Sequence, residues 1–423
     1  MRPIDTGDTA WMLISTALVM LMTIPGLALF YGGMVRRKNV LSTLVQSFGI
    51  CCLVSLVWVT VGYTLSFSTG NAWIGDFSRV FLRGIADHFH QGSDSAFTLG
   101  AGSAVPTPMT IPESVYLLYQ MSFAIITPAL ITGAFAERIK FSALCLFTVL
   151  WSIFVYAPVA HWVWSPLGWV AGLGAVDFAG GTVVHINSGI AGLVCALMIG
   201  PRRGLKRDDM SPHNLSYAII GASLLWVGWF GFNAGSALGA NGRAGMAMLT
   251  TQVAAAAGGI AWMLVEWWRM GKPTALGIIS GAVAGLVAVT PAAGFVLPSG
   301  ALAIGLIAGS VCFYSATVLK NRLGYDDSLD AFGVHGVGGI VGALLTGIFA
   351  YGPLSATADN PAGVSGSWTQ LLHQGEAVAV TILWSVVVTA LIIVVVNKLV
   401  GIRVSDDDEQ EGLDMTQHGE KLN

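Results

Sequence analysis

Eleven long apolar runs, separated by shorter polar stretches, dominate this sequence. A helix needs about 20 consecutive apolar residues to cross the hydrocarbon core of a bilayer. Charged residues make up only 10% of the chain, against roughly 25% in soluble domains, so they are too few to cover a surface that faces water. We therefore expect an all-α integral membrane protein with about eleven transmembrane helices, at 9–31, 40–68, 113–134, 140–160, 177–200, 215–238, 245–268, 274–290, 299–320, 333–351 and 376–400.

The cationic residues are divided unevenly between the two sides of these spans. Sixteen of the 20 Lys and Arg residues follow odd-numbered spans, and the other side keeps only Arg2, Arg79, Arg83 and Arg243. Lys and Arg are enriched in the cytoplasmic loops of membrane proteins. The sequence therefore predicts an odd number of spans, with the N-terminus outside and the C-terminus in the cytoplasm. Met1 to Ala10 contain no basic segment and no cleavage site, so we expect no cleavable leader.

Two polar stretches are longer than simple connections. Residues 69–112 form an outside loop, and residues 401–423 form a tail with an acidic run at 406–409. We divide the chain into a transmembrane domain, 1–400, and a cytoplasmic regulatory tail, 401–423. One interpretation of the tail is a solvated, partly disordered end. The other is that its carboxylates dock on the inner loop that carries Arg202, Arg203, Lys206 and Arg207.

Two histidines lie inside predicted spans and open the same sequence pattern. His185 begins H-x-x-x-G-I-x-G, and His335 begins it again 150 positions later. An ionisable side chain is costly in a bilayer core, so each histidine marks a functional site unless it only hydrogen-bonds a neighbouring helix. The matching contexts indicate an inverted repeat of spans 1–5 and 6–10, followed by a final helix. One histidine from each half should then meet the other at the middle.

Several longer motifs resemble those of the Amt/Mep/Rh ammonium transporters. The stretch 177–192 reads DFAGGTVVHINSGIAG and the stretch 229–236 reads WFGFNAGS, forms that fit the bacterial Amt branch better than the Rh branch. GAFAER at 133–138 and FGVHG at 332–336 also match, and residues 401–414 resemble the family's cytoplasmic tail. The likeness follows the family's order over nearly the whole chain.

The resemblance implies a transporter or channel, not an enzyme, that works without a cofactor in the inner (plasma) membrane and serves nitrogen uptake. It further implies a homotrimer, transport of methylammonium as an analogue, and control by a PII-type signalling protein that inserts a loop into the pore exit. A bare cation costs tens of kcal/mol in an apolar pore by idealised estimates. Ammonium is therefore expected to lose its proton and cross as ammonia, with or without coupled proton movement.

The family's site residues map onto matching positions of this chain. Ammonium would bind at an outer vestibule to Phe123, Trp164 and Ser236, because aromatic faces attract cations and a hydroxyl accepts a hydrogen bond. Phe232 would stack on Phe123 as a gate, Trp229 would line the pore further in, and His185 and His335 would line its narrow apolar part. Met121 stands where some members have glycine, which affects the local helix packing but not the expected role of Phe123.

Asp177 has two interpretations that do not exclude one another. It opens the fifth predicted span, where an aspartate is a good helix N-cap. In the family it lies below the recruitment site and supports the cation there.

Three rival functions remain open from the residues. A membrane-embedded metalloenzyme would use the two histidines with Asp177, although that carboxylate lies about 12 Å along a helix from His185. A signalling receptor for ammonium would need more than the short tail as an output domain. A Rh-like gas channel is the alternative within transporters. The five cysteines lie in apolar runs without metal-binding spacing, which favours packing.

Overall fold

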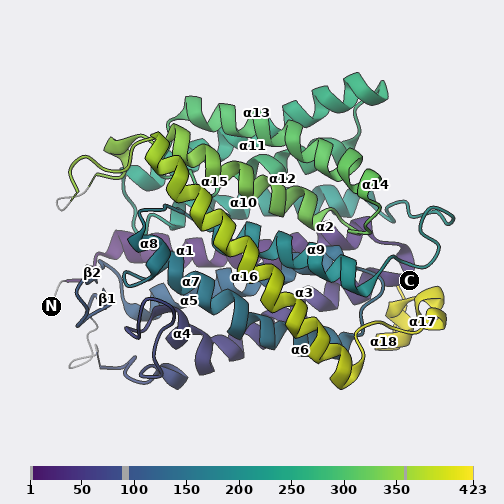
Figure 1. Cartoon of the computed structure of the whole chain (residues 1–423), viewed down its shortest axis with the longest axis horizontal. Coiled ribbons are helices and arrows are strands. Elements are labelled where there is room, and N and C mark those ends of the chain that lie inside the picture. Colours follow the sequence, from purple (N-terminus) through teal and green to yellow (C-terminus); the bar gives the residue numbers. More distant parts are fainter. Residues whose placement is uncertain (1–2, 88–94, 357–359, 423) are drawn as a thin grey trace.

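A computed structural model describes residues 3–87, 95–356 and 360–422. The helices lie side by side in one bundle, with the two chain ends at opposite ends of it (Figure 1). Within the described residues, ten helical segments are long and apolar enough to cross a membrane, and a shorter apolar helix spans Ala275–Val289. The prediction of an all-α membrane protein with about eleven spans is confirmed. Arg2, which the sequence analysis places on the outer side of the membrane, is not among the described residues.

Besides short 3₁₀- and π-helical turns, the first five spans and the outer loop contain nine α-helices and one pair of short strands among the described residues. They are α1 Thr6–Leu21, α2 Ala28–Met34, α3 Val40–Val57, α4 Tyr63–Phe67, β1 Thr98–Leu99, β2 Thr107–Pro108, α5 Glu113–Ile131, α6 Phe141–Trp151, α7 Ala157–Trp164, α8 Trp169–Gly172 and α9 Asn187–Ile199. The two strands pair antiparallel. The remaining helices are α10 Leu215–Gly235, α11 Gly242–Met270, α12 Ala275–Val289, α13 Pro298–Tyr314, α14 Lys320–Leu323, α15 Val337–Phe349, α16 Trp368–Val400, α17 Asp406–Glu411 and α18 Leu413–His418.

The two halves of the bundle pack in equivalent ways. In the first half, α5 contacts α1, α3 and α9; in the second, α12 contacts α10, α11 and α15. Likewise α3 contacts α6, as α11 contacts α13. This correspondence is the one expected of a repeat of spans 1–5 and 6–10. The final long helix, α16, crosses one face of the bundle diagonally and contacts α6, α9 and α15 (Figure 1).

The last span begins earlier than the sequence predicts. Hydropathy places it at 376–400, whereas α16 starts at Trp368. The two glutamines in this extension lower its hydropathy, but both are buried and hydrogen-bonded. Gln370 donates to the carbonyl of Gly174 at 2.9 Å, and Gln374 donates to that of Val176 at 2.8 Å. The polar turns of α16 therefore pack on the segment that precedes the fifth span.

The described part of the tail is folded onto the first half, unlike a solvated end. Asp414 accepts hydrogen bonds from the backbone N–H groups of Leu41 and Ser42, at 3.1 and 2.7 Å, and so caps the start of α3. Glu409 accepts one from the backbone N–H of Arg203 at 2.6 Å. Arg202 does not reach the tail; its guanidinium pairs with Asp326 at 2.9 Å.

Candidate functional site

His185 and His335 meet between the two halves. Their Nδ1 atoms lie 3.3 Å apart, and the two rings are nearly parallel, with centroids separated by 5.4 Å. Both side chains are almost fully buried. Because a neutral imidazole carries one proton, one Nδ1 must donate and the other accept. The outward-facing Nε2 of one ring is then a donor and that of the other an acceptor.

Glycine makes this meeting possible. The segments Gly181–Ile186 and Phe332–Gly336, which carry the histidines, are wide helical turns that continue into α9 and α15. A Cβ at Gly189 would lie 2.1 Å from the backbone nitrogen of Gly336. A Cβ at Gly339 would lie 3.0 Å from the carbonyl oxygen of Gly181. At the glycine four residues after each histidine, the two backbones therefore approach too closely to accommodate a side chain easily.

A row of aromatic rings leads to the histidines from the side of the bundle that the sequence predicts to be the outer one, and 'outer' and 'inner' are used below in that sense. The rings of Phe123 on α5 and Phe232 on α10 lie 4.2 Å apart, centre to centre. Phe232 is 5.9 Å from the ring of His185, and Trp229 stacks on His185 at 5.3 Å. Phe123 and Phe232 are 1% and 0% exposed, so both rings lie fully inside the bundle between the cavity and the histidines.

An outer cavity of about 260 Å³ ends at Phe123. It is lined by Phe123, Trp164 and Ser236, the three residues that the sequence assigns to a cation site, and also by Tyr119 and Phe178. The Trp164 ring meets Phe123 edge to face, with centroids 5.6 Å apart. Its indole N–H donates to the carbonyl of Asp177 at 3.0 Å. That bond fixes the indole and leaves its π face, not its N–H, as the group available to a ligand.

Tyr119 fixes the hydroxyl of Ser236. Its phenolic oxygen lies 3.1 Å from Ser236 Oγ and 2.8 Å from the carbonyl of Phe232. Ser236 Oγ donates its own proton to that carbonyl at 2.9 Å. The serine therefore has an oxygen lone pair to offer, as a cation site requires. Sequence reasoning missed Tyr119; its position four residues before Phe123, on the same helix face, was the available signal.

Asp177 is held by the turn that it precedes. Its carboxylate accepts hydrogen bonds from the backbone N–H groups of Gly180, Gly181 and Thr182, at 2.8, 2.6 and 2.7 Å, and from the Thr182 hydroxyl. It does not line the outer cavity. The geometry is that of a helix cap, and the backbone carbonyl of the same residue accepts the hydrogen bond from the Trp164 indole.

The second half repeats this arrangement with Asp327. Asp327 precedes His335 by eight residues, as Asp177 precedes His185, and it accepts hydrogen bonds from the N–H groups of Ala331 and Phe332 at 3.0 and 2.8 Å. Sequence reasoning missed this aspartate, although the repeated D-x₇-H spacing was available. Burial, followed by the charge of Asp330, raises the pKa of the Asp327 carboxyl from 3.8 to about 6.

The pKa of the neighbouring Asp326 is shifted in the opposite direction. Burial raises the pKa of its carboxyl, but two hydrogen bonds and the charge of Arg202 outweigh that effect and leave the pKa below 3.8. Arg138, fully buried, donates to the backbone of Asp326 and lies 3.6 Å from its carboxylate. Burial lowers the pKa of Arg138 to about 10.

A small pocket lies on the other side of the histidine pair. His335, Tyr31, Ser280 and Asp330 contribute to its wall. Asp330 also forms an ion pair with Lys320. The histidines therefore stand between this inner pocket and the aromatic row that ends the outer cavity. Within residues 3–87, 95–356 and 360–422, no group of three or more His, Cys, Asp or Glu side chains is arranged to hold a metal ion.

Comparison with known proteins gives one consistent result. The sequence profile of the Ammonium Transporter Family matches residues 10–422. The chain is 50% identical over 419 residues to an ammonium transporter of Bacillus subtilis, covering 98% of each chain. It is 49% identical over 419 residues to one of Aquifex aeolicus, covering 99% of this chain and 93% of that one. Its structure resembles the crystal structure of Saccharomyces cerevisiae Mep2 with a TM-score of 0.84, at 36% identity, over 96% of this chain and 88% of that one.

Proposed function

The chain belongs to the ammonium transporter family, and from that membership we propose how it moves its cargo. Ammonium is recruited in the outer cavity, loses its proton there, and ammonia passes the phenyl gate and the paired histidines. The proton stays behind or follows by its own route. The single observation that carries this proposal is the unbroken series of rings from Trp164 through Phe123 and Phe232 to His185 and His335.

Recognition of the cation rests on three groups of the outer cavity. The π faces of Trp164 and Phe123 attract a cation by about 2 kcal/mol when water is displaced. Ser236 adds a hydrogen-bond acceptor that Tyr119 holds in place. The cavity is open to the outside at this level, so the cation need not be dehydrated fully before it binds.

Passage beyond the gate requires the neutral molecule. The path below Phe123 is enclosed by apolar and aromatic side chains, where a bare cation is strongly disfavoured. Ammonia needs both a donor and an acceptor along the way, and the histidine pair offers one of each. In this proposal Trp229 keeps the ring of His185 in place by stacking on it.

Asp177 acts as a helix cap and as electrostatic support for the cation in this scheme. All of the hydrogen bonds that the structure gives its carboxylate hold the start of the fifth span. In this proposal Asp177 has a second role, as a negative charge near the cation. The charge then favours ammonium over uncharged competitors in the cavity above.

We further propose that the protein is a homotrimer of the inner (plasma) membrane, with its N-terminus outside and its tail in the cytoplasm. The Lys and Arg distribution supports this orientation. A PII-type signalling protein would act at the cytoplasmic face, where the docked tail and the inner loops present charged groups. The inner pocket, with Asp330 in its wall, is where a partner's loop would block the exit.

The recruitment step is tested by Trp164→Leu in reconstituted membranes. Currents and methylammonium uptake are measured together, with methylammonium and ammonium in competition. The variant should lose discrimination between the two more than it loses conduction, because the gate and the histidines are untouched. Competition unchanged from the wild type would remove Trp164 from the cation site. Trp73→Leu, a change of an outer-loop tryptophan that does not line the cavity, is the matched control.

A further inference from the structure

Arg243 is a cation beside the outer cavity that lacks a carboxylate partner among the described residues. It lies in the first turn of α11, and its Nε donates to the carbonyl of Gly294 at 2.9 Å. The guanidinium carbon lies 4.9 Å from the centre of the Phe178 ring and 4.5 Å from that of Phe295. These two rings meet edge to face at 5.8 Å, so the guanidinium is held by aromatic faces.

Phe178 connects this cation with the cation site. It follows Asp177 in the chain and lines the same cavity as Trp164 and Ser236. Its ring is 8% exposed, and it occupies space that only a glycine at position 294 leaves free, since a Cβ there would lie 2.1 Å from the ring. The carboxylate of Asp177 is turned toward backbone N–H groups. The positive charge of Arg243 therefore lies behind the cavity wall, and among the described residues no carboxylate forms an ion pair with it.

A positive charge in this place has a definite consequence for a cationic cargo. Arg243 is only partly exposed, so water and salt screen its field less than they screen an arginine on the surface. Its guanidinium also covers one face of Phe178, and a ring that already binds one cation attracts a second less strongly. Both effects weaken the hold of the cavity on a cation. A transport site needs such a limit, because a cargo bound too tightly does not move on.

We propose that Arg243 determines the affinity of the outer site for ammonium, by repelling the cation and by occupying Phe178. It opposes the attraction of Asp177 and of the aromatic faces of Trp164 and Phe123. This inference rests on the proposed recruitment site and adds to it a charge that sets how tightly the site binds. Arg243 does not touch the cargo; it is a positioning residue that acts through Phe178 and through its field.

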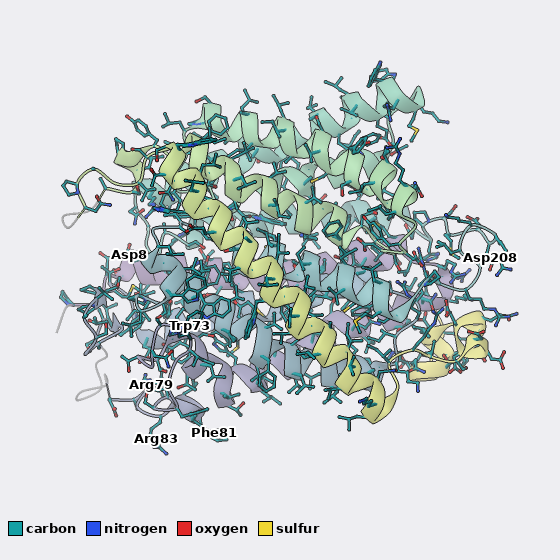
Figure 2. All side chains as sticks on the ribbon, viewed as in Figure 1. Asp8, Trp73, Arg79, Phe81, Arg83 and Asp208 are labelled. Atoms are coloured by element: carbon teal, nitrogen blue, oxygen red, sulfur yellow. The ribbon has the colours of Figure 1, made fainter. Side chains whose placement is uncertain are left out.

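The test measures the half-saturating ammonium concentration and the maximal transport rate separately in reconstituted membranes. Arg243→Gln and the apolar Arg243→Met should lower the half-saturating concentration about three- to tenfold, the range open to one partly screened charge. The maximal transport rate should stay equal or fall. Arg243→Lys keeps the charge and should remain close to the wild type. Arg83→Gln removes an exposed outer arginine at the edge of the molecule (Figure 2) and should change neither quantity.

Changes in ionic strength and a variant of Phe178 separate the effect of the Arg243 charge from the effect of its packing. Added salt should narrow the difference between the wild type and Arg243→Gln, because it screens the repulsion. Phe178→Leu removes the ring but keeps the cation, so it reports the packing contribution alone. An unchanged or raised half-saturating concentration in both neutral variants would overturn the inference. If Trp164→Leu still loses discrimination between ammonium and methylammonium, only the role of Arg243 is excluded. If Trp164→Leu also behaves like the wild type, the recruitment site itself is excluded.

Discussion

The two halves of the molecule use the same device at the pore, but they place it in different surroundings. Each half has an aspartate that caps a wide helical turn, and eight residues later a histidine that meets its counterpart. Asp177 is partly exposed near the outer cavity, and its carboxylate accepts bonds from at least three backbone N–H groups. Asp327 is 1% exposed, accepts bonds from two, and lies near a second carboxylate, Asp330.

This difference shows what symmetry does and does not determine. The repeat places the two histidines in contact, because equivalent helices cross at equivalent glycines. It does not determine the charge of the two caps. Asp177 is partly exposed and accepts several backbone hydrogen bonds, whereas burial raises the pKa of the Asp327 carboxyl. In the mechanism that we propose, the outer half recruits the cation and the inner half passes the neutral molecule.

The histidine pair should show the largest effect. Replacing both His185 and His335 with Ala removes the only donor and acceptor that we propose for the cargo between the gate and the inner pocket. Transport should fall, or selectivity change, by about tenfold or more, the equivalent of one or two hydrogen bonds. Each single Ala variant should also alter flux or selectivity, and His185→Ala should be the more severe because His185 stacks on Trp229.

The double variant must remain folded for this result to count. Its extraction from the membrane and its size on a column should match those of the wild type. A folded double variant with wild-type flux and wild-type selectivity would show that the histidines only join the two halves.

The second largest effect on transport should come from the two capping aspartates, and it should differ between Asp177 and Asp327. Asp177→Asn keeps a good N-cap and removes the charge, whereas Asp177→Ala removes both, including a capping contribution of about 1 kcal/mol. Loss of transport in both variants, with intact folding, indicates electrostatic support of the cation. Near-normal transport by Asp177→Asn, but not by Asp177→Ala, indicates that Asp177 acts only as a helix cap. Asp327→Asn is the matched control in the other half and should transport nearly as well as the wild type.

Much of this arrangement could be predicted from the sequence, and the exceptions have physical causes. The spans, the repeat and the contact between His185 and His335 follow from hydropathy and from a duplicated motif. The early start of α16 was missed because buried glutamines that bond to carbonyls read as polar residues. Tyr119 and Asp327 were missed because their roles depend on which residues face them, and spacing alone does not give that. Docking of the tail was one of the two interpretations of the sequence, but its carboxylates bind backbone N–H groups of Leu41, Ser42 and Arg203, which no side-chain pattern reveals.

A pH dependence of stability should distinguish the inner cap from the outer one. The pKa of Asp327 is raised in the folded protein, from 3.8 to about 6, so folding favours its protonated form. This contribution to stability is complete below about pH 4 and is lost as the pH rises through 6. We compare the unfolding temperature of Asp327→Asn with that of the wild type at each pH. This difference should be about two to four degrees more in favour of the variant at pH 7.5 than at pH 4.5. The same offset at both pH values would mean that the buried carboxyl is not the titrating group.

The tail breaks the symmetry of the halves on the inner side, since the partners described for it belong to the first half. Lys38 donates to the carbonyls of Glu409 and Gln410, and Asn39 accepts from the backbone N–H of Leu413. Arg403 pairs with Glu409 at 2.8 Å within the tail itself. A single hydrogen bond contributes only about 1 kcal/mol to stability. The cap that Asp414 supplies to α3 is worth about 1 kcal/mol more. The tail should therefore be held firmly enough to order the inner face, and weakly enough for a partner to displace it.

Removing the tail should consequently have the smallest effect on transport through the pore and the clearest effect on regulation by a PII-type protein. Deletion of 401–423 should lower transport or uncouple it from a PII-type protein, without abolishing membrane insertion. Asp414→Ala should reproduce part of the effect, because the start of α3 then loses its cap, while Glu420→Ala, an exposed change in the same tail, should not. Flux and pull-down with a PII protein from the same source measure both outcomes. Unchanged transport together with unchanged PII binding after the deletion would show that the docked tail plays no part in regulation, and that the inner faces of the two halves are equivalent in function despite their different contacts.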